Sequence, residues 1–149
     1  MFRLSTLAAI AALAAIACRQ AIAASAAIAD RVNSLNSALA HALVEPIGFG
    51  IGIHAGVTIA GAIGYERHAQ FTVIGDPVNV AARLEALTKT LGCEVLMSEE
   101  VYERAGFGPE DLPAHDVEAR GREATVKVRS VARAADLARL IPAEAPAAA

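Results

Sequence analysis

The sequence is poor in the residue types that mark several classes of protein. Its two cysteines, Cys18 and Cys93, stand far apart and belong to no CxxC or Cys/His cluster. Neither a disulfide framework nor a zinc site is therefore predicted, and a reducing, cytoplasmic compartment is favoured. Tryptophan is absent, aromatic residues make up 4%, and the formal net charge is −3. These values argue against nucleic acid as a partner, because such proteins carry basic surfaces and base-stacking aromatics.

A long hydrophobic run is also lacking. The segment from Leu4 to Cys18 carries no charge, but it is shorter than the ~20 residues that span a bilayer. Its alanines are only weakly hydrophobic, which favours an ordinary helix over membrane association through residues 4–18. A signal-peptide core is a third interpretation, since Arg3 precedes the run and small residues follow it.

What the chain does contain is enough apolar material for one domain: 149 residues, of which 55% are hydrophobic. Residues 8–44 include no glycine or proline, and the spacing predicts a long amphipathic helix that ends at Glu45-Pro46. We expect this helix to pack on the rest of the domain through one apolar stripe. The stripe comprises Ile28, Val32, Leu35, Leu39 and Leu43.

Strand signals follow. Residues 49–55 alternate bulky and small side chains, which predicts a strand, and its two interior glycines suggest the close approach of another backbone or a ligand. Residues 57–63 fit no pattern clearly, and residues 64–68 look like a loop. Residues 71–74 form a second expected strand, buried in the core. Asp76 as N-cap and Pro77 at the first helical position then begin a helix that stops at Gly92.

The last third is predicted from similar signals. Residues 93–97 are expected to form a strand, and Ser98 to cap a short helix. Residues 106–116 are expected to be a loop, and residues 125–131 alternate as a final strand. An Ala/Pro-rich tail closes the chain from residue 141.

Two polar residues on the helix after Pro77 could carry chemistry. Asn79 and Arg83 are four residues apart, so both side chains leave the same helix face. An amide that orients a sugar and a guanidinium that stabilises phosphoryl charge suit phosphoryl transfer. On spacing alone, an ordinary surface arginine with an asparagine near the helix start is the favoured interpretation.

The longer stretch of sequence around this pair changes this interpretation. Residues 49–89, FGIGIHAGVTIAGAIGYERHAQFTVIGDPVNVAARLEALTK, closely resemble the second half of the class III adenylate/guanylate cyclase catalytic domain. The later EVLMSEEVYERAG and ARGREATVKVRSV resemble its closing strand, helix and strand. The resemblance covers residues 17–134, between an Ala-rich segment at 1–16 and a tail at 135–149. It implies an α+β, ferredoxin-like nucleotide cyclase fold that is truncated on its N-terminal side.

The resemblance also implies roles for particular residues. Asn79 matches the family asparagine that positions the ribose, and Arg83 the arginine that stabilises pentavalent phosphorus. Thr72 stands where the family selects the base, and threonine there is similar to adenylate rather than guanylate cyclases. Arg120 or Arg122 matches a basic triphosphate-binding position, with the register left open.

Other family features have no counterpart here. The family binds Mg or Mn through two aspartates of its opening strand and hairpin, whereas the first acidic residue of this chain is Asp30. Asp76 is better explained by helix capping than by metal binding, and His54 by a structural role at a strand end. No metal ligand is therefore assigned.

The resemblance implies ATP as substrate and a second cyclase catalytic domain, in a homodimer or heterodimer, as partner. Because each family site combines metal carboxylates from one domain with the Asn/Arg pair of the other, the isolated chain is expected to be inactive. The alternatives are a non-catalytic partner module and a truncated gene product.

Overall fold

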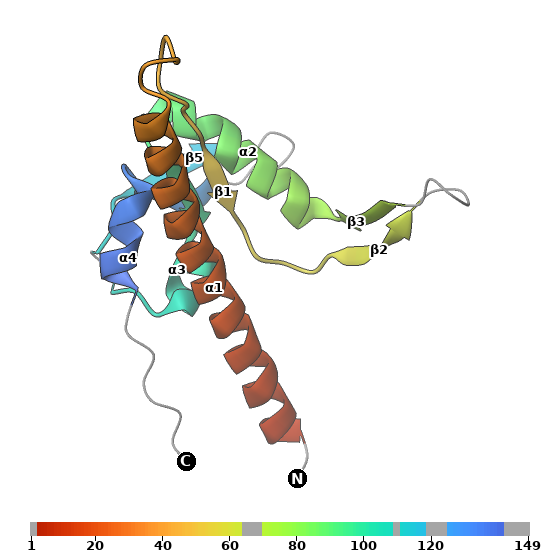
Figure 1. Cartoon of the computed structure of the whole chain (residues 1–149). Coiled ribbons are helices and arrows are strands. Elements are labelled where there is room, and N and C mark those ends of the chain that lie inside the picture. The colour runs from red at the N-terminus through yellow and green to blue at the C-terminus, as the bar shows by residue number, and fades with distance from the viewer. Residues whose placement is uncertain (1–2, 64–69, 109–110, 119–124, 142–149) are drawn as a thin grey trace, which may run out of the picture.

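The computed structural model describes residues 3–63, 70–108, 111–118 and 125–141. Figure 1 shows a small mixed sheet between helices, with one long helix and one hairpin extending from the body. The elements in chain order are α1 (Arg3–Ala38), β1 (Ile51–Ile53), β2 (Ile59–Ile63), β3 (Gln70–Ile74), α2 (Asp76–Leu91), β4 (Val95–Ser98), α3 (Glu99–Ala105), β5 (Ala114–Glu118), β6 (Thr125–Val131), the short 3₁₀ helix η2 (Ala134–Asp136) and α4 (Leu137–Leu140).

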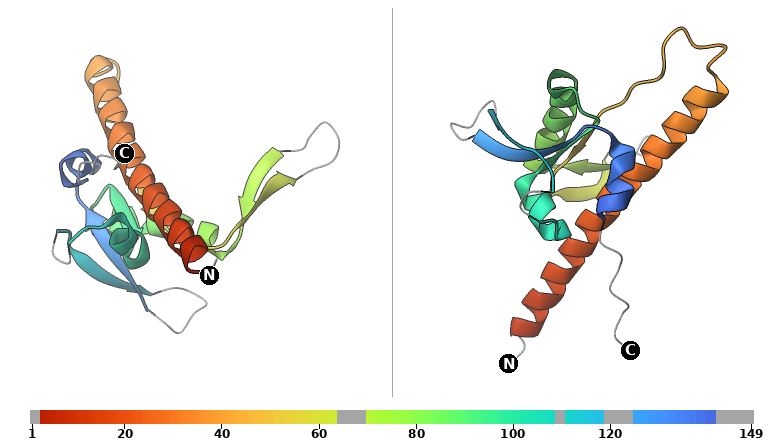
Figure 2. Two further views of the ribbon diagram at one scale, coloured as in Figure 1. Left: turned by 90° about the horizontal axis from the view of Figure 1, so that it is seen from below. Right: turned by 90° about the vertical axis from the view of Figure 1, so that its left-hand side faces the viewer.

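The main sheet has the strand order β1-β4-β6-β5. β1 runs parallel to β4, with Ile51 opposite Val95, and the remaining neighbours are antiparallel. β2 and β3 form a separate antiparallel hairpin that projects from the body in Figure 1 and in the left view of Figure 2. The α+β prediction is thereby confirmed.

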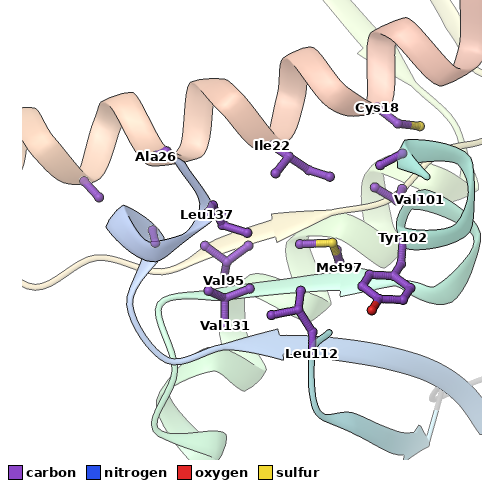
Figure 3. Close-up of a cluster of buried hydrophobic side chains, with 13 residues drawn as sticks. Cys18, Ile22, Ala26, Val95, Met97, Val101, Tyr102, Leu112, Val131 and Leu137 are labelled. Carbon is purple, nitrogen blue, oxygen red and sulfur yellow. The ribbon is translucent and has the colours of Figure 1, made fainter. Parts of the chain in front are cut away.

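Successive residues of β4 point to opposite faces of the sheet, and helices cover both faces. Val95 and Met97 pack with α1, α3 and the C-terminal helices in the larger core cluster (Figure 3). Leu96 points to the other face, where it packs with Leu84 of α2 and with Val128. All four residues of β4 are buried, as expected for a central strand covered on both sides.

The packing face of α1 differs from the expected one. The buried side chains are Cys18, Ile22, Ser25, Ala26 and Ala29, whereas Ile28 is 47% and Leu35 45% exposed. The predicted stripe is therefore wrong as a core face. Small side chains let α1 lie close to α3 and η2, and this close packing decides which face is buried.

The end of α1 also differs from the prediction. The helix stops at Ala38, and residues 39–42 form turns in place of a continuous helix to Glu45. The Asn36 side chain holds the returning loop: it accepts a hydrogen bond from Ile47 N (2.7 Å) and donates one to Ile47 O (3.0 Å). Among the helices that the structure describes, none has the length and apolarity needed to cross a membrane.

Two glycines of the strand region determine how α2 sits on the sheet. A Cβ at Gly52 would overlap the Ala81 carbonyl oxygen and lie 2.5 Å from Glu85 N; one at Gly50 would overlap the Thr88 hydroxyl. The helix backbone therefore rests directly on the strand backbone. The prediction that these glycines mark a close backbone approach is confirmed, although the strand itself is limited to Ile51–Ile53.

Several other predictions need correction. β3 is a strand as expected but is not buried, since Phe71 is 78% and Ile74 52% exposed on the projecting hairpin.

The stretch 106–116, predicted as a loop, contains the start of β5, whose alternation is too weak to read from the sequence. β4 begins two residues later than predicted and includes Ser98. The unassigned stretch 57–63 contributes β2. The expected loop at 64–68 and nearly all of the tail from residue 141 lie outside the described residues.

A buried arginine joins β6 to α3 and to the segment that precedes β5. Arg129 donates from Nε and Nη2 to the two carboxylate oxygens of Glu99, each at 2.7 Å, and from Nη1 to Leu112 O at 2.9 Å. Its guanidinium also lies 4.5 Å from the ring centroid of Tyr102, which stacks on Phe107. The bidentate pair lowers the pKa of Glu99, mainly through these hydrogen bonds.

The Gly52 contact predicts a large effect from one methyl group. Gly52→Ala should lower the free energy of unfolding by about 3 kcal/mol, because the added Cβ meets backbone atoms that cannot move independently. Gly61→Ala is the matched control, since a Cβ there meets nothing within 4 Å. Urea unfolding of both variants tests this, and equal stabilities would contradict the packing described.

The Glu99–Arg129 pair predicts a pH dependence. Because the folded-state pKa of Glu99 lies below its unfolded-state value, the pair stabilises the fold above the unfolded value. This stabilisation is lost as the pH falls through the folded-state pKa. Glu99→Gln should be less stable than the unmodified chain at neutral pH, with a difference that shrinks in acid. Urea unfolding over a pH series measures this, with exposed Glu85→Gln as the control.

Candidate functional site

The site that the sequence predicts is built around the start of α2. Gly75 is the N-cap, with φ 153° and ψ 166°, a conformation that favours glycine. Asp76 is therefore the first helical residue, so the predicted N-cap is one residue too late. Pro77 is the second helical residue, one position later than predicted, and its missing N–H costs nothing in the first turn. Gly92 ends the helix in the left-handed conformation, as predicted.

The two faces of α2 have different neighbours. Ala81, Leu84 and Thr88 face the sheet, and Leu84 and Thr88 are buried. Asn79 and Arg83, one turn apart, leave the opposite side of the helix. Asn79 is exposed and Arg83 partly exposed, and Arg83 takes part in side-chain interactions within the chain. The structure therefore presents the predicted pair together, directed away from the core.

Thr72 lies on the hairpin that leads into α2. It is opposite Gly61 in the β2–β3 pairing and is partly buried. Its neighbour Val73 lines a cavity, so Thr72 points to the other face of the hairpin. The third predicted element, Arg120 or Arg122, lies outside the described residues.

A cavity of about 730 Å³ lies on the inner side of α2. Its lining comes from the first turns of α2, the end of β1, α3 and one flank of α1. Most of these side chains are small or apolar, and the Glu100–Arg104 ion pair (2.6 Å) lies at its border. Asn79 and Arg83 are not among the lining residues, so the cavity and the Asn/Arg pair are separate features on opposite sides of α2.

The polar side chains that line the cavity include His54 and Cys18. His54 Nδ1 lies 2.9 Å from the hydroxyl of buried Ser98, and this bond ties the end of β1 to the end of β4. It supports the structural interpretation of His54. Burial raises the pKa of the Cys18 thiol, an effect that Arg104 opposes and Glu100 reinforces. A protonated thiol at neutral pH is a poor nucleophile, so nothing here indicates thiolate chemistry.

The acidic residues of the described chain do not fit a catalytic cation. No three His, Cys, Asp or Glu side chains in the ranges that the structure describes converge on one point. Asp76, at the start of α2, is engaged in interactions within the chain. Hard divalent cations need several oxygen ligands, and these residues do not supply them. No catalytic step is therefore assigned to a metal held by this chain.

With this geometry established, comparison with known proteins identifies the family. The sequence profile of the adenylate and guanylate cyclase catalytic domain matches residues 6–130, which is most of the chain. The chain belongs to this family. The match begins before residue 17 and ends before residue 134, and it takes in much of α1.

Curated relatives include adenylate cyclases. An adenylate cyclase of Anabaena cylindrica is 37% identical over 89 residues, which are 57% of this chain and 18% of the relative. Adenylate cyclase 1 of Rhizobium meliloti (strain 1021) is 32% identical over 104 residues, 70% of this chain and 16% of the relative. The chain thus spans less than a fifth of the length of these relatives.

Solved structures support the fold. The guanylyl cyclase Cya2 superposes with a TM-score of 0.66 at 24% identity, covering 78% of this chain and 58% of that one. The adenylyl cyclase CyaB from P. aeruginosa gives a TM-score of 0.58 at 24% identity, covering 74% and 58%. The sequence predicted the family and the Asn79/Arg83 pair. It did not predict the cavity, because the residues that line it come from separate helices and strands.

Proposed function

We propose that this chain contributes Asn79 and Arg83 to the cyclisation of a nucleoside triphosphate, in a site completed by a second cyclase catalytic domain. The observation that carries the proposal is the position of the pair. Both residues leave the outer side of a helix whose inner side rests directly on β1. A helix held in this way presents its side chains in a fixed direction, and catalysis by transition-state stabilisation requires such preorganisation.

The proposed chemistry is an internal phosphoryl transfer. The ribose 3′-oxygen attacks the α-phosphorus, the bond from that phosphorus to the bridging oxygen breaks, and pyrophosphate leaves. The proton of the 3′-hydroxyl passes to a base or to solvent. Negative charge grows on the pentavalent phosphorus, and the Arg83 guanidinium would stabilise it with directed N–H donors. The Asn79 amide would hold the ribose so that its 3′-oxygen lies in line with the leaving group.

The remaining components are assigned to the partner. Since the described acidic residues do not form a cation site, the Mg or Mn ions that the family uses would be held by the carboxylates of the other domain. This division explains why the Asn/Arg pair faces outward. Such an arrangement functions only when a second domain covers the outer side of α2.

ATP is the proposed nucleotide. Thr72 can donate and accept a hydrogen bond, and it lies on the strand that leads into α2. The curated relatives from Anabaena and Rhizobium are adenylate cyclases, which supports the same choice. The product would be cyclic AMP.

Complementation tests the role of the pair. The chain is mixed with a cyclase domain that keeps its metal-binding aspartates but has lost its own Asn and Arg, and cyclic AMP formation from ATP is measured. The unmodified chain should restore activity. Arg83→Ala should reduce the restored kcat by about 10²–10³, as expected when one transition-state donor is removed.

Two controls separate this role from folding and from binding. Glu85→Gln changes an exposed residue of α2 that lies about 200° around the helix from Arg83, and it should rescue as well as the unmodified chain. Arg83→Lys keeps the charge but loses the planar guanidinium, so it should rescue only weakly. Equal rescue by Arg83→Ala would exclude the assigned role, and no rescue by the unmodified chain would favour a non-catalytic partner module.

The chain alone should not make cyclic AMP. Assayed with ATP and either magnesium or manganese, the purified chain should give no more product than a blank without protein. The reason is that the described residues supply no cation site, and both cations are needed for the displacement. A preparation from a host without its own cyclase is required, and turnover there would contradict the proposed division of labour.

A further inference from the structure

The main sheet has an open edge at β1. Among the strands that the structure describes, β1 pairs only with β4, so its other edge has no strand beside it. Ile51 donates its N–H to Glu94 O on the β4 side (2.8 Å), and the backbone groups of successive strand residues point in alternate directions. The N–H and C=O groups of Gly52, and of His54 directly after the strand, therefore point toward the open edge.

The 730 Å³ cavity lies at this edge, between the two layers of helices. α1 and α3 line one side of it and the first turns of α2 the other, with Ile53, His54 and Ala55 between them. In Figure 1, β1 lies between α1 and α2. No residue of β4 lines the cavity, so the cavity is on the side of β1 that faces away from β4. We call this space the β1 slot.

The walls of the β1 slot are formed mainly by short, uncharged side chains. They include Ala14, Ala17 and Ala21 of α1 and Pro77, Val78 and Ala81 of α2. Among the described residues of the lining, the charged ones are Glu100 and Arg104, which pair with each other. A charged group that entered the slot would be buried without a partner, which is costly. The walls therefore favour an occupant that is apolar on both of its sides.

We infer that the β1 slot accepts an extended apolar segment of another polypeptide, which joins the sheet as a strand beside β1. The open edge requires main-chain donors and acceptors, and the two walls require apolar side chains on opposite faces. An extended polypeptide supplies both, because its side chains alternate between faces while its backbone pairs sideways. A strand covered on both faces is typically a continuous apolar run, so a run of valine, isoleucine or leucine is the expected sequence.

The β1 strand of a second copy does not meet these requirements. Glycines at positions 50 and 52 leave one of its faces without side chains. That face is also in contact with the backbone of its own α2, so the strand cannot enter the slot of another copy. A compact apolar molecule would fill the walls but would leave the groups of Gly52 and His54 unpaired. A partner segment with side chains on both faces satisfies the edge and the walls together.

Binding of a synthetic peptide to the full chain tests the inference. The probe is a blocked, fluorescently labelled heptapeptide of valine and isoleucine, with N-methyl groups on alternate residues so that only one of its edges can pair. The control peptide has the same side chains but an N-methyl group on every residue, so neither edge can donate hydrogen bonds. Fluorescence anisotropy should show binding of the probe and at least about 10-fold weaker binding of the control peptide.

Hydrogen exchange measured by NMR locates the bound peptide. The amide protons of Gly52 and His54 should exchange more slowly when the probe is bound, because they then donate to its carbonyl groups. The control peptide should leave their exchange unchanged. Binding of the probe without protection of these two amides would place it elsewhere and would overturn the inference.

Charges introduced on the two walls test whether both faces of the peptide are covered. Ala17→Glu and Val78→Glu each place a carboxylate in the lining, on α1 and α2 respectively, and should weaken probe binding at least about 10-fold. Ala27→Glu and Ala86→Glu are the matched controls, since they add the same charge to exposed positions of the same helices outside the lining. Both controls should bind like the unmodified chain. Thermal unfolding followed by circular dichroism establishes that all four variants fold.

Three further outcomes would overturn the inference. The first is no binding of the probe at concentrations up to about 1 mM. The second is equal binding of the two peptides, which would make the β1 slot a site for apolar groups without strand pairing. The third is a dimer of the chain alone in which Gly52 and His54 are already protected, because a second copy would then be the occupant. The assays contain no nucleotide, and Asn79 and Arg83 do not line the slot, so these results do not depend on the proposed function.

Discussion

The close contact between α2 and β1 is the constraint on which the rest of the structure depends. With glycine at positions 50 and 52, the helix lies on the strand without intervening side chains. Gly56 extends the contact, since a Cβ there would overlap Pro77 at the start of the helix. These three glycines thus determine how closely α2 approaches β1 and where the helix begins. Because the inner side of the helix is fixed by backbone contact, Asn79 and Arg83 can only point outward.

This part of the fold was predictable because its signals are local. Pro77 at the helix start and Gly92 at its end each act through their own backbone conformation. The glycines at positions 50 and 52 indicated a close neighbour, although the sequence could not say that the neighbour was α2. The pairing of Asn79 with Arg83 followed from helix geometry alone, and the order of motifs then identified the family. The boundaries of β4 and the existence of β5 depend on pairing with β6, which no local pattern specifies.

The wrong predictions concern elements whose burial depends on residues that are distant in the sequence. Bulky residues made the stripe from Ile28 to Leu43 look like a core face, yet α1 packs through Cys18, Ile22 and small residues. A helix approaches its neighbours most closely where its side chains are short, and hydrophobic spacing does not record that preference. Phe71 and Ile74 similarly read as a buried strand, because the sequence cannot show that their hairpin projects from the sheet.

The cavity and the outward Asn/Arg pair lie on different sides of the contact between α2 and β1. The cavity and the β1 edge border the inner side of α2, whereas Asn79 and Arg83 occupy its outer side. A partner that covers one side need not displace a partner on the other. The backbone contact at Gly50 and Gly52 lies between the two surfaces, and close-packed interiors transmit displacement rather than absorb it. A displacement of β1 would therefore move α2, and with it the direction of the Arg83 side chain.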